Sequence, residues 1–235
     1  MASLHPVEPV TPSVGWGVLH LLYHVDRERA EREPGGAKRV LDAVASLATD
    51  DHQVLTFSVL GHKADLGVMA LGPDLARLGA FEQELAAAPL RSSWSYVSLT
   101  ERSEYTTDEE RARQRLYPKL PAKRAICFYP MSKRRHSSDN WYQLDFDARK
   151  NLMAGHARVG RTYAGRVVQL ITGSTGLDDW EWGVTLLADD PAALKEIVYD
   201  MRFDEVSARY AEFGPFVTGL LGEPAEVLAR VGLVP

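Results

Sequence analysis

Three consecutive stretches decide the fold class: Gly165-Arg-Val-Val-Gln-Leu-Ile-Thr-Gly173, Trp180-Glu-Trp-Gly-Val-Thr-Leu-Leu-Ala188 and Pro191-Ala-Ala-Leu-Lys-Glu-Ile-Val-Tyr-Asp-Met201. The first two are short and rich in strand formers, so they predict two strands. The third predicts a helix, because Asp189 and Asp190 can cap it and Pro191 suits its first turn. A strand at Ala125–Tyr129, a helix at Asp145–Ala157 followed by Gly160, and a last strand at Phe213–Leu221 complete the order β-α-β-β-α-β.

The first half of the chain repeats this order. Strands are predicted at Trp16–Val25, Gln53–Leu60, Ala64–Leu71 and Ser92–Thr100, with helices at Arg27–Leu47, broken near Glu33-Pro-Gly-Gly36, and at Pro73–Ala87. Two such halves predict an α+β fold of two ferredoxin-like domains. Each antiparallel sheet keeps one face free of helices, so the two sheets can pack on each other as a dimeric α+β barrel within one chain.

The predicted domain boundaries follow from these patterns. They are an irregular N-terminal arm at 1–13, an N-terminal ferredoxin-like domain at 14–105, a basic connecting segment at 106–124, a C-terminal ferredoxin-like domain at 125–222 and a C-terminal tail at 223–235.

Composition excludes several classes of protein. The chain has 235 residues, of which 45% are hydrophobic and 25% charged, which excludes a disordered, collagen-like or coiled-coil chain. No apolar run reaches the roughly 18–20 residues of a membrane span. The first residues lack the basic and apolar regions of a signal peptide. Cys127 is the single cysteine, which excludes an internal disulfide and any site built on two cysteines. We therefore expect a cytoplasmic protein.

Charge is distributed unevenly along the chain. Lys and Arg number 27 against 32 Asp and Glu, a net charge of −5, which disfavours nucleic acid as a partner. From Arg111 to Arg135 there are nine basic residues and no acidic one, so the remaining chain carries 18 basic and 32 acidic groups, a balance of −14. The basic stretch is either a solvated face or a site for a small polyanion. An apolar run within it, Ala125–Met131, favours the second interpretation.

Two residues stand out as candidates for chemistry. His156 shares a helical face with Leu152 and Met153, and a histidine ending such a stripe is either a core residue or an axial ligand for a flat apolar cofactor. Tyr129 has apolar residues before it and cations after it. It is either a strand-end aromatic or a phenol at the edge of a polyanion site, where it could exchange a proton or an electron.

Other motifs carry less chemistry. His20 and His24 are four residues apart on a predicted strand, roughly 13 Å, so they cannot share one metal. The run Thr172-Gly-Ser-Thr-Gly176 lacks the phosphate-loop and dinucleotide fingerprints and predicts a hairpin turn.

Longer motifs resemble the coproheme decarboxylases of the chlorite-dismutase-like superfamily. The resemblance is dense over residues 110–221 and weaker over 14–105. It rests on Cys127-Phe-Tyr-Pro-Met-Ser-Lys-Arg-Arg135, Asn140-Trp-Tyr142, Leu152-Met-Ala-Gly-His156, Gly160-Arg-Thr-Tyr-Ala-Gly165, Gln169-Leu-Ile-Thr-Gly-Ser174, Leu177-Asp-Asp-Trp-Glu-Trp-Gly-Val184 and Tyr199–Phe216.

The resemblance implies an enzyme of haem biosynthesis. Such an enzyme uses hydrogen peroxide to decarboxylate two propionates of iron-coproporphyrin III (coproheme) to vinyls through a tyrosyl radical, giving haem b. Coproheme is then both substrate and redox centre, with no separate metal. The resemblance further implies a homopentamer of chains with two ferredoxin-like domains, and a transient contact with coproporphyrin ferrochelatase. It implies neither nucleic-acid binding nor a membrane span.

Residue roles carried over by the resemblance lie in the C-terminal domain and the connecting segment. His156 matches the axial ligand of the haem iron, Tyr129 the redox-active tyrosine and Lys133 the lysine beside the other reacting propionate. Coproheme-binding positions are matched by Arg115, Met131, Gln169, Arg202 and Ser207. Gln169 stands where true chlorite dismutases have an arginine, which argues against chlorite chemistry.

Two points stay open in the resemblance. Ala112 occupies the position of a distal histidine found in the actinobacterial branch. The hydrogen-bond acceptor for His156 is one of Asp178, Glu181 and Asp204, since an acidic partner raises the basicity of a ligating imidazole. The alternative functions are a non-catalytic haem-binding or haem-sensing protein and a haem peroxidase or chlorite-decomposing enzyme.

Overall fold

The computed structural model describes residues 14–49, 51–106 and 108–234; the expected arm at 1–13 lies outside the described residues. The strands are β1 (Val14–Val25), β2 (Gln53–Val59), β3 (Leu66–Gly72), β4 (Leu90–Glu101), β5 (Ala125–Lys133), β6 (Val167–Gly173), β7 (Trp182–Ala188), β8 (Ala211–Phe213) and β9 (Val217–Gly222). The helices are α1 (Arg27–Arg32), α2 (Gly36–Leu47), α3 (Leu75–Ala86), α4 (Glu109–Leu116), α5 (Phe146–Arg161), α6 (Pro191–Met201), α7 (Glu205–Tyr210) and α8 (Pro224–Arg230), with a 3₁₀ turn at Trp141–Gln143.

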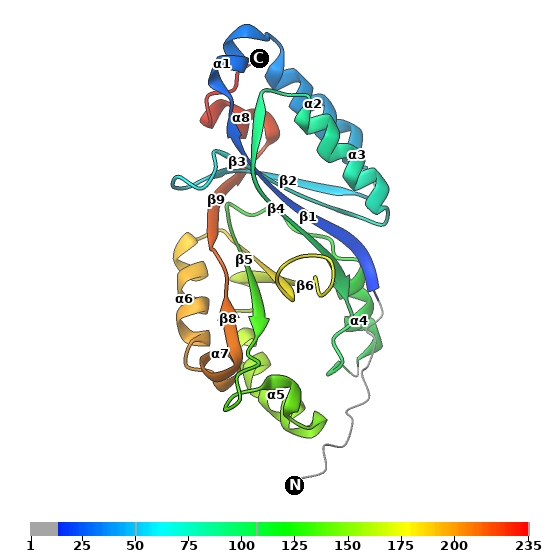
Figure 1. Ribbon diagram of the computed structural model, residues 1–235, viewed down its shortest axis with the longest axis vertical. Coiled ribbons are helices and arrows are strands. Elements are labelled where there is room, and N and C mark those ends of the chain that lie inside the picture. Colours follow the sequence, from blue (N-terminus) through cyan, green and yellow to red (C-terminus); the bar gives the residue numbers. More distant parts are fainter. Residues whose placement is uncertain (1–13, 50, 107, 235) are drawn as a thin grey trace.

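The strands form one antiparallel sheet that closes on itself. Its order is β7-β6-β4-β1-β3-β2-β9-β5-β8, and an additional β5–β7 pairing joins the two ends into a barrel, with the short β8 alongside β5 (Figure 1). Within it, β4-β1-β3-β2 and β6-β7-β5-β9 each have the strand order of a ferredoxin-like unit. The α+β fold class predicted from the sequence is therefore confirmed.

Short seams hold the two halves together. β4 and β6 are paired at Leu99–Gly173 and Thr100–Thr172, and β2 pairs with β9 from Thr56–Gly222 to Val59–Gly219. Helices α2, α3 and α8 gather at one end of the molecule and α5, α6 and α7 at the other (Figure 1). Each half thus presents its own helix layer on the outside of the barrel.

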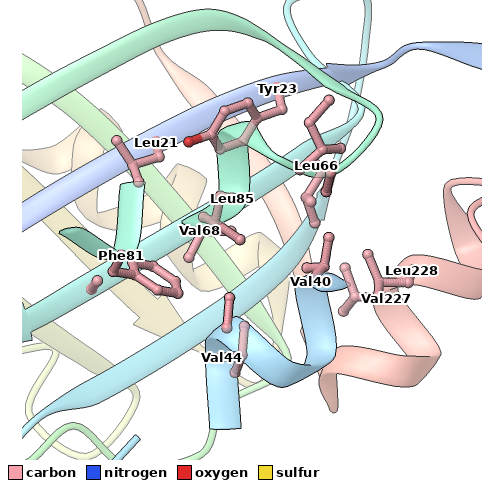
Figure 2. Close-up of a cluster of buried hydrophobic side chains, with 14 of the residues drawn as sticks. Leu21, Tyr23, Val40, Val44, Leu66, Val68, Phe81, Leu85, Val227 and Leu228 are labelled. Atoms are coloured by element: carbon pink, nitrogen blue, oxygen red, sulfur yellow. The ribbon is translucent and has the colours of Figure 1, made fainter. Parts of the chain in front are cut away.

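Alternation along the strands divides the apolar residues into separate cores. Side chains two residues apart share a sheet face. Val18 and Leu22 of β1 point into the barrel, whereas Leu19, Leu21 and Tyr23 point to the helices. Figure 2 shows this outer core of the first half, in which α2, α3 and α8 converge on β1 and β3. The corresponding outer core of the second half is the layer that contains the candidate site.

Several predicted boundaries differ from the structure. The break in the first helix is confirmed, since α1 ends at Arg32 and α2 follows Gly35, whose φ of 83° suits glycine. By contrast, α5 continues through Gly160 to Arg161. A Cβ at Gly160 would lie 3.2 Å from Met201 Cε, so this glycine permits a close packing contact rather than ending the helix. The predicted last strand is two strands, β8 and β9, separated by residues 214–216.

Two segments to which the sequence analysis assigned no helix contain one each. The connecting segment 106–124 includes α4, and the expected tail 223–235 includes α8. Val227 and Leu228 of α8 are buried in the outer core of the first half, so the end of the described chain returns to the N-terminal domain. No helix among the described residues is long and apolar enough to cross a membrane.

Candidate functional site

His156 is held in place by a buried carboxylate. Asp145 caps the start of α5, accepting a hydrogen bond from Ala148 N at 2.7 Å, and His156 lies in the second half of this helix. Its Nδ1 is 2.7 Å from Oδ2 of Asp204, whose side chain is 8% exposed against 28% for the imidazole. With Nδ1–H donating to the carboxylate, Nε2 keeps its lone pair for a ligand.

Asp204 is fixed by its own surroundings. Its Oδ2 also accepts from the backbone N–H groups of Val206 at 3.1 Å and Ser207 at 3.4 Å, so it caps α7. The two other candidate partners of His156 are engaged elsewhere: Asp178 accepts from Val97 N at 2.8 Å, and Glu181 accepts from Lys133 N at the end of β5 and from the Arg135 guanidinium. The structure therefore selects Asp204 among the three.

Tyr129, Met131 and Lys133 share one face of β5. They point to the helix layer, whereas Phe128, the residue directly before Tyr129, points into the barrel and stacks on His20 with ring centroids 3.8 Å apart. The predicted reactive residues of β5 thus lie on the side of the sheet that α5 and α6 cover.

Tyr129 is buried among aromatic rings. Its ring stacks on Phe216 with centroids 4.3 Å apart and meets the edge of Phe213 at 5.7 Å. Burial raises the pKa of Tyr129 well above its usual range, because the ionised phenolate would lose its hydration. The side chain is consequently a neutral phenol throughout the physiological pH range.

Lys133 is a buried cation beside the same carboxylate that holds His156. Its side chain is 8% exposed, and its Nζ lies 4.6 Å from the centroid of the Trp141 ring. Burial lowers the pKa of Lys133 to about 8, an effect that the carboxylates of Asp204 and Glu181 oppose. Asp204 therefore hydrogen-bonds the imidazole and acts on the ammonium group through its charge.

Two more predicted site residues lie close to this group. Ser207 is buried, and its backbone N–H donates to Asp204. Gln169 on β6 donates from Nε2 to the carbonyl oxygen of Gly160 at 3.2 Å, one turn beyond His156 on α5. Gln169 thus stands where the sheet and the helix approach each other.

The two arginines predicted to bind coproheme lie apart from the residues around His156. Arg202 is exposed and lies over the ring of Tyr199, at 5.0 Å from its centroid. Arg115 is exposed on α4, a helix that packs on β1 and β4. Ala112, on the same helix, is buried. No contact within the described residues joins either arginine to His156, so their roles stay predictions.

Three cations of the basic stretch are paired or buried. Lys123 pairs with Asp189 at 2.6 Å, Arg135 pairs with Glu181, and Lys133 is buried. No role was predicted for Trp141, Phe213 or Phe216, although all three lie within the motifs that carry the resemblance. Their place beneath Lys133 and around Tyr129 depends on segments that meet only in the fold.

Comparison with known proteins defines the class. A family model described as chlorite dismutase matches residues 35–221, and the chain belongs to this family. A coproheme decarboxylase of Staphylococcus saprophyticus is 42% identical over 226 residues, which cover 87% of this chain and 91% of that protein. The predicted resemblance to an enzyme of this superfamily is thereby confirmed.

Other relatives are described as heme-binding proteins. One, from Natronomonas pharaonis, is 40% identical over 97% of this chain, which spans only 42% of that longer protein. A solved structure of a heme-binding protein from Thermus thermophilus superposes with a TM-score of 0.90 at 39% identity and covers 97% of this chain and 100% of that one. A chlorite dismutase of Candidatus Nitrospira defluvii shares the fold, with a TM-score of 0.77 at 18% identity and coverage of 93% and 96%.

Proposed function

We propose that this protein catalyses the hydrogen-peroxide-dependent decarboxylation of two propionates of iron-coproporphyrin III to vinyls, giving haem b. The observation that carries the proposal is the arrangement around Asp204. A half-buried imidazole is hydrogen-bonded to this carboxylate, whose charge also acts on a buried ammonium group, and a buried phenol occupies the same strand face as the ammonium. The 42% identical coproheme decarboxylase supports the same reaction.

The residues present suit this substrate. Coproheme is a flat apolar ring with a central iron and four carboxylates. Nε2 of His156 would hold the iron, and the anionic Asp204 would make the imidazole a stronger donor. Apolar side chains at the site, among them Met131 and Phe216, suit the ring. Lys133 offers a charge to a carboxylate, and Arg202 and Arg115 can bind carboxylates through two parallel hydrogen bonds.

The reaction balances with one peroxide for each propionate. A propionate loses carbon dioxide, one proton and two electrons as it becomes a vinyl group. Hydrogen peroxide takes up two electrons and two protons and leaves as two waters, so one further proton is consumed. When bound, the coproheme iron would pass these electrons to the peroxide. Tyr129 transfers the first electron and then removes a hydrogen atom from the β-carbon of the propionate. The resulting carbon radical gives up the second electron as carbon dioxide leaves, which forms the vinyl group.

The surroundings of Tyr129 and Lys133 suit the roles proposed for them. Because Tyr129 is a neutral phenol, it must lose its proton together with its electron, which keeps the net charge of the apolar site unchanged. Lys133 is protonated at neutral pH, since its pKa of about 8 lies above 7. It orients the carboxylate of the second propionate.

A peroxide titration tests the proposal. Purified protein is mixed with ferric coproheme, hydrogen peroxide is added stepwise, and mass spectrometry follows the porphyrin, which we expect to lose carbon dioxide twice. Tyr129→Phe should bind coproheme without converting it, while Tyr117→Phe, at a tyrosine that is 47% exposed, should remain active. Unchanged coproheme with the wild-type protein would refute the reaction, and full activity of Tyr129→Phe would refute the role of the tyrosine.

A second candidate is a haem-binding protein without turnover. The heme-binding descriptions of the Natronomonas and Thermus relatives and the buried Ala112, in the place of a distal histidine, favour it. It predicts tight binding of haem b and no vinyl formation in the same titration. Under either function we propose a cytoplasmic homopentamer, and under the first a transient contact with coproporphyrin ferrochelatase; the family resemblance supports both.

A further inference from the structure

Glu181 is a buried carboxylate to which the proposed reaction gives no part. It directly precedes β7 and is only 5% exposed. Its Oε2 accepts a hydrogen bond from the backbone N–H of Lys133 at 2.7 Å, and its Oε1 forms an ion pair with Arg135. The hydroxyl of Tyr142 is also hydrogen-bonded to this carboxylate. A buried charge is tolerated where several donors meet it, as here.

All three donors belong to one segment, Lys133–Tyr142, which we name the cationic hairpin. Its two arms are paired: Trp141 N donates to Arg134 O at 3.0 Å, and Arg135 is bridged to Asn140. The donors to Glu181 come from both arms, Lys133 and Arg135 from the first and Tyr142 from the second. The carboxylate therefore ties the two arms to the start of β7.

The hairpin places two of its cations, Lys133 and Arg135, over aromatic rings. Lys133 Nζ lies 4.6 Å from the Trp141 ring centroid, and the Arg135 guanidinium carbon lies 4.9 Å from that of Tyr142. Because the rings are on the second arm and the cations on the first, these contacts require the arms to keep their register. The backbone of Glu181 is itself fixed against β5, since its N–H donates to Met131 O at 3.1 Å.

We propose that Glu181 is a positioning residue for Lys133: its carboxylate clamps both arms of the cationic hairpin and so sets the ammonium group over Trp141, beside Asp204. That Lys133 then meets a propionate rests on the proposed function. The clamp itself is a property of the protein without substrate, so it can be tested separately.

Charge strengthens the effect of the clamp. The charged groups that face Lys133 are Asp204, from the turn before α7, and Glu181, from the start of β7; both stabilise the ammonium form against the cost of burial. The Trp141 ring that covers the ammonium carries no net charge. Removing the charge of Glu181 should therefore lower the pKa of Lys133 further and leave less of the ammonium form at neutral pH.

The first experiment uses the substrate-free protein. Lysine is labelled with ¹³C at Cε, the Lys133 signal is assigned with Lys133→Arg, and its chemical shift is followed against pH. We expect a wild-type midpoint near 8 and a midpoint about one pH unit lower in Glu181→Gln. Glu196→Gln is the matched control, because Glu196 pairs with Arg166 on an exposed surface, and its midpoint should equal that of the wild type. An unchanged midpoint in folded Glu181→Gln would overturn the proposal.

A second variant covers the case in which Glu181→Gln does not fold. Arg135→Gln removes one partner of the carboxylate but leaves its charge, so the pKa of Lys133 should rise by a few tenths of a pH unit or more. Arg135 is 61% exposed, so the substitution leaves the core intact. A wild-type midpoint in this variant would overturn the electrostatic part of the proposal.

Coproheme binding separates this inference from the proposed function. We expect the affinity of Glu181→Gln to be about tenfold below that of the wild type at pH 8, with its loss of affinity at high pH shifted to lower pH. Combining Glu181→Gln with Lys133→Met should cost no more than Lys133→Met alone, since the clamp acts through the lysine; additive losses would overturn the proposal. If the wild type fails to bind coproheme, the proposed function is refuted, while the NMR titration still decides the role of Glu181.

Discussion

Asp204 should contribute to both stability and porphyrin affinity, because one carboxylate oxygen serves His156 and the start of α7. Asp204→Ala removes the buried hydrogen bond to the imidazole, which is 2.7 Å long. A hydrogen bond to a charged acceptor contributes about 2 kcal/mol to the free energy of unfolding. The substitution also removes the cap on Val206 and Ser207, about 1 kcal/mol more. The sum of about 3 kcal/mol corresponds to a melting temperature lower by about 6–12 °C for a chain of this size.

Asp204→Asn separates these two contributions. The amide oxygen can still cap α7 and accept from Nδ1, but the negative charge is lost. We expect a stability loss of about 1 kcal/mol and an affinity for ferric coproheme about tenfold lower than that of the wild type, the lower end of the effect of removing a partner from a ligating histidine.

Calorimetry and a titration followed by the Soret band measure the two effects. His156→Ala and the double variant His156→Ala/Asp204→Ala complete a mutant cycle, in which we expect a coupling energy of about 2 kcal/mol. Additive stability losses in this cycle, or an Asp204→Asn variant with wild-type affinity, would refute the assignment of Asp204 as the partner of His156.

Three further outcomes are expected. Lys133 has a folded-state pKa of about 8, below its usual value, so burial of its ammonium form destabilises the wild type at pH 7 and this cost disappears as pH rises towards 10. Between pH 7 and pH 10 the wild type should therefore gain about 2–3 kcal/mol of unfolding free energy that Lys133→Met does not gain, as measured by urea unfolding. A difference in stability between the two proteins that does not change with pH would contradict the burial of the charge. Leu228→Ala should lower the free energy of unfolding by about 3 kcal/mol, because the side chain is 2% exposed in the outer core of the first half. Leu220→Ala, at a 37% exposed position, should lower it by less than about 1 kcal/mol. Equal losses of stability in the two variants would argue against the packing of α8. Phe216→Ala should lower the pKa of Tyr129 towards its usual value, because water would reach the side of the ring that Phe216 covers. Ultraviolet titration of tyrosinate measures this pKa, and Phe203→Ala, at a 70% exposed position, is the control. An unchanged titration would show that Phe216 does not shield the phenol.

Local sequence signals predicted elements well where they agreed with packing. The helix Pro191–Met201 has the expected bounds because Asp190 caps it and Pro191 begins it, both of which act within one turn. Gly160 shows where a local signal misleads. A glycine after a helical pattern usually ends the helix, but here its lack of a Cβ lets α5 approach Met201 and Gln169. That requirement comes from residues beyond the helix itself.

The C-terminal segment shows the same dependence on distant contacts. Residues 223–235 carry too short a pattern to predict a docked helix, since short helices gain most of their stability from tertiary packing. α8 forms against α2 and β2 of the first half, to which Val227 and Leu228 contribute buried side chains. Only a barrel closed through the β2–β9 seam brings these distant parts of the chain together.

For the site, the sequence alone determined which residue types were present, and the helical repeat placed His156 on one face of a helix. It did not place Met131 and Lys133 on a strand face with Tyr129, because the predicted strand ended at Tyr129 whereas β5 continues to Lys133. Only the tertiary structure chose Asp204 over Asp178 and Glu181 as the partner of His156. The three carboxylates are equivalent in chemistry, and they differ only in where the folded chain places them. The same holds for Lys133, because its pKa depends on the burial and carboxylates that segments distant in sequence supply.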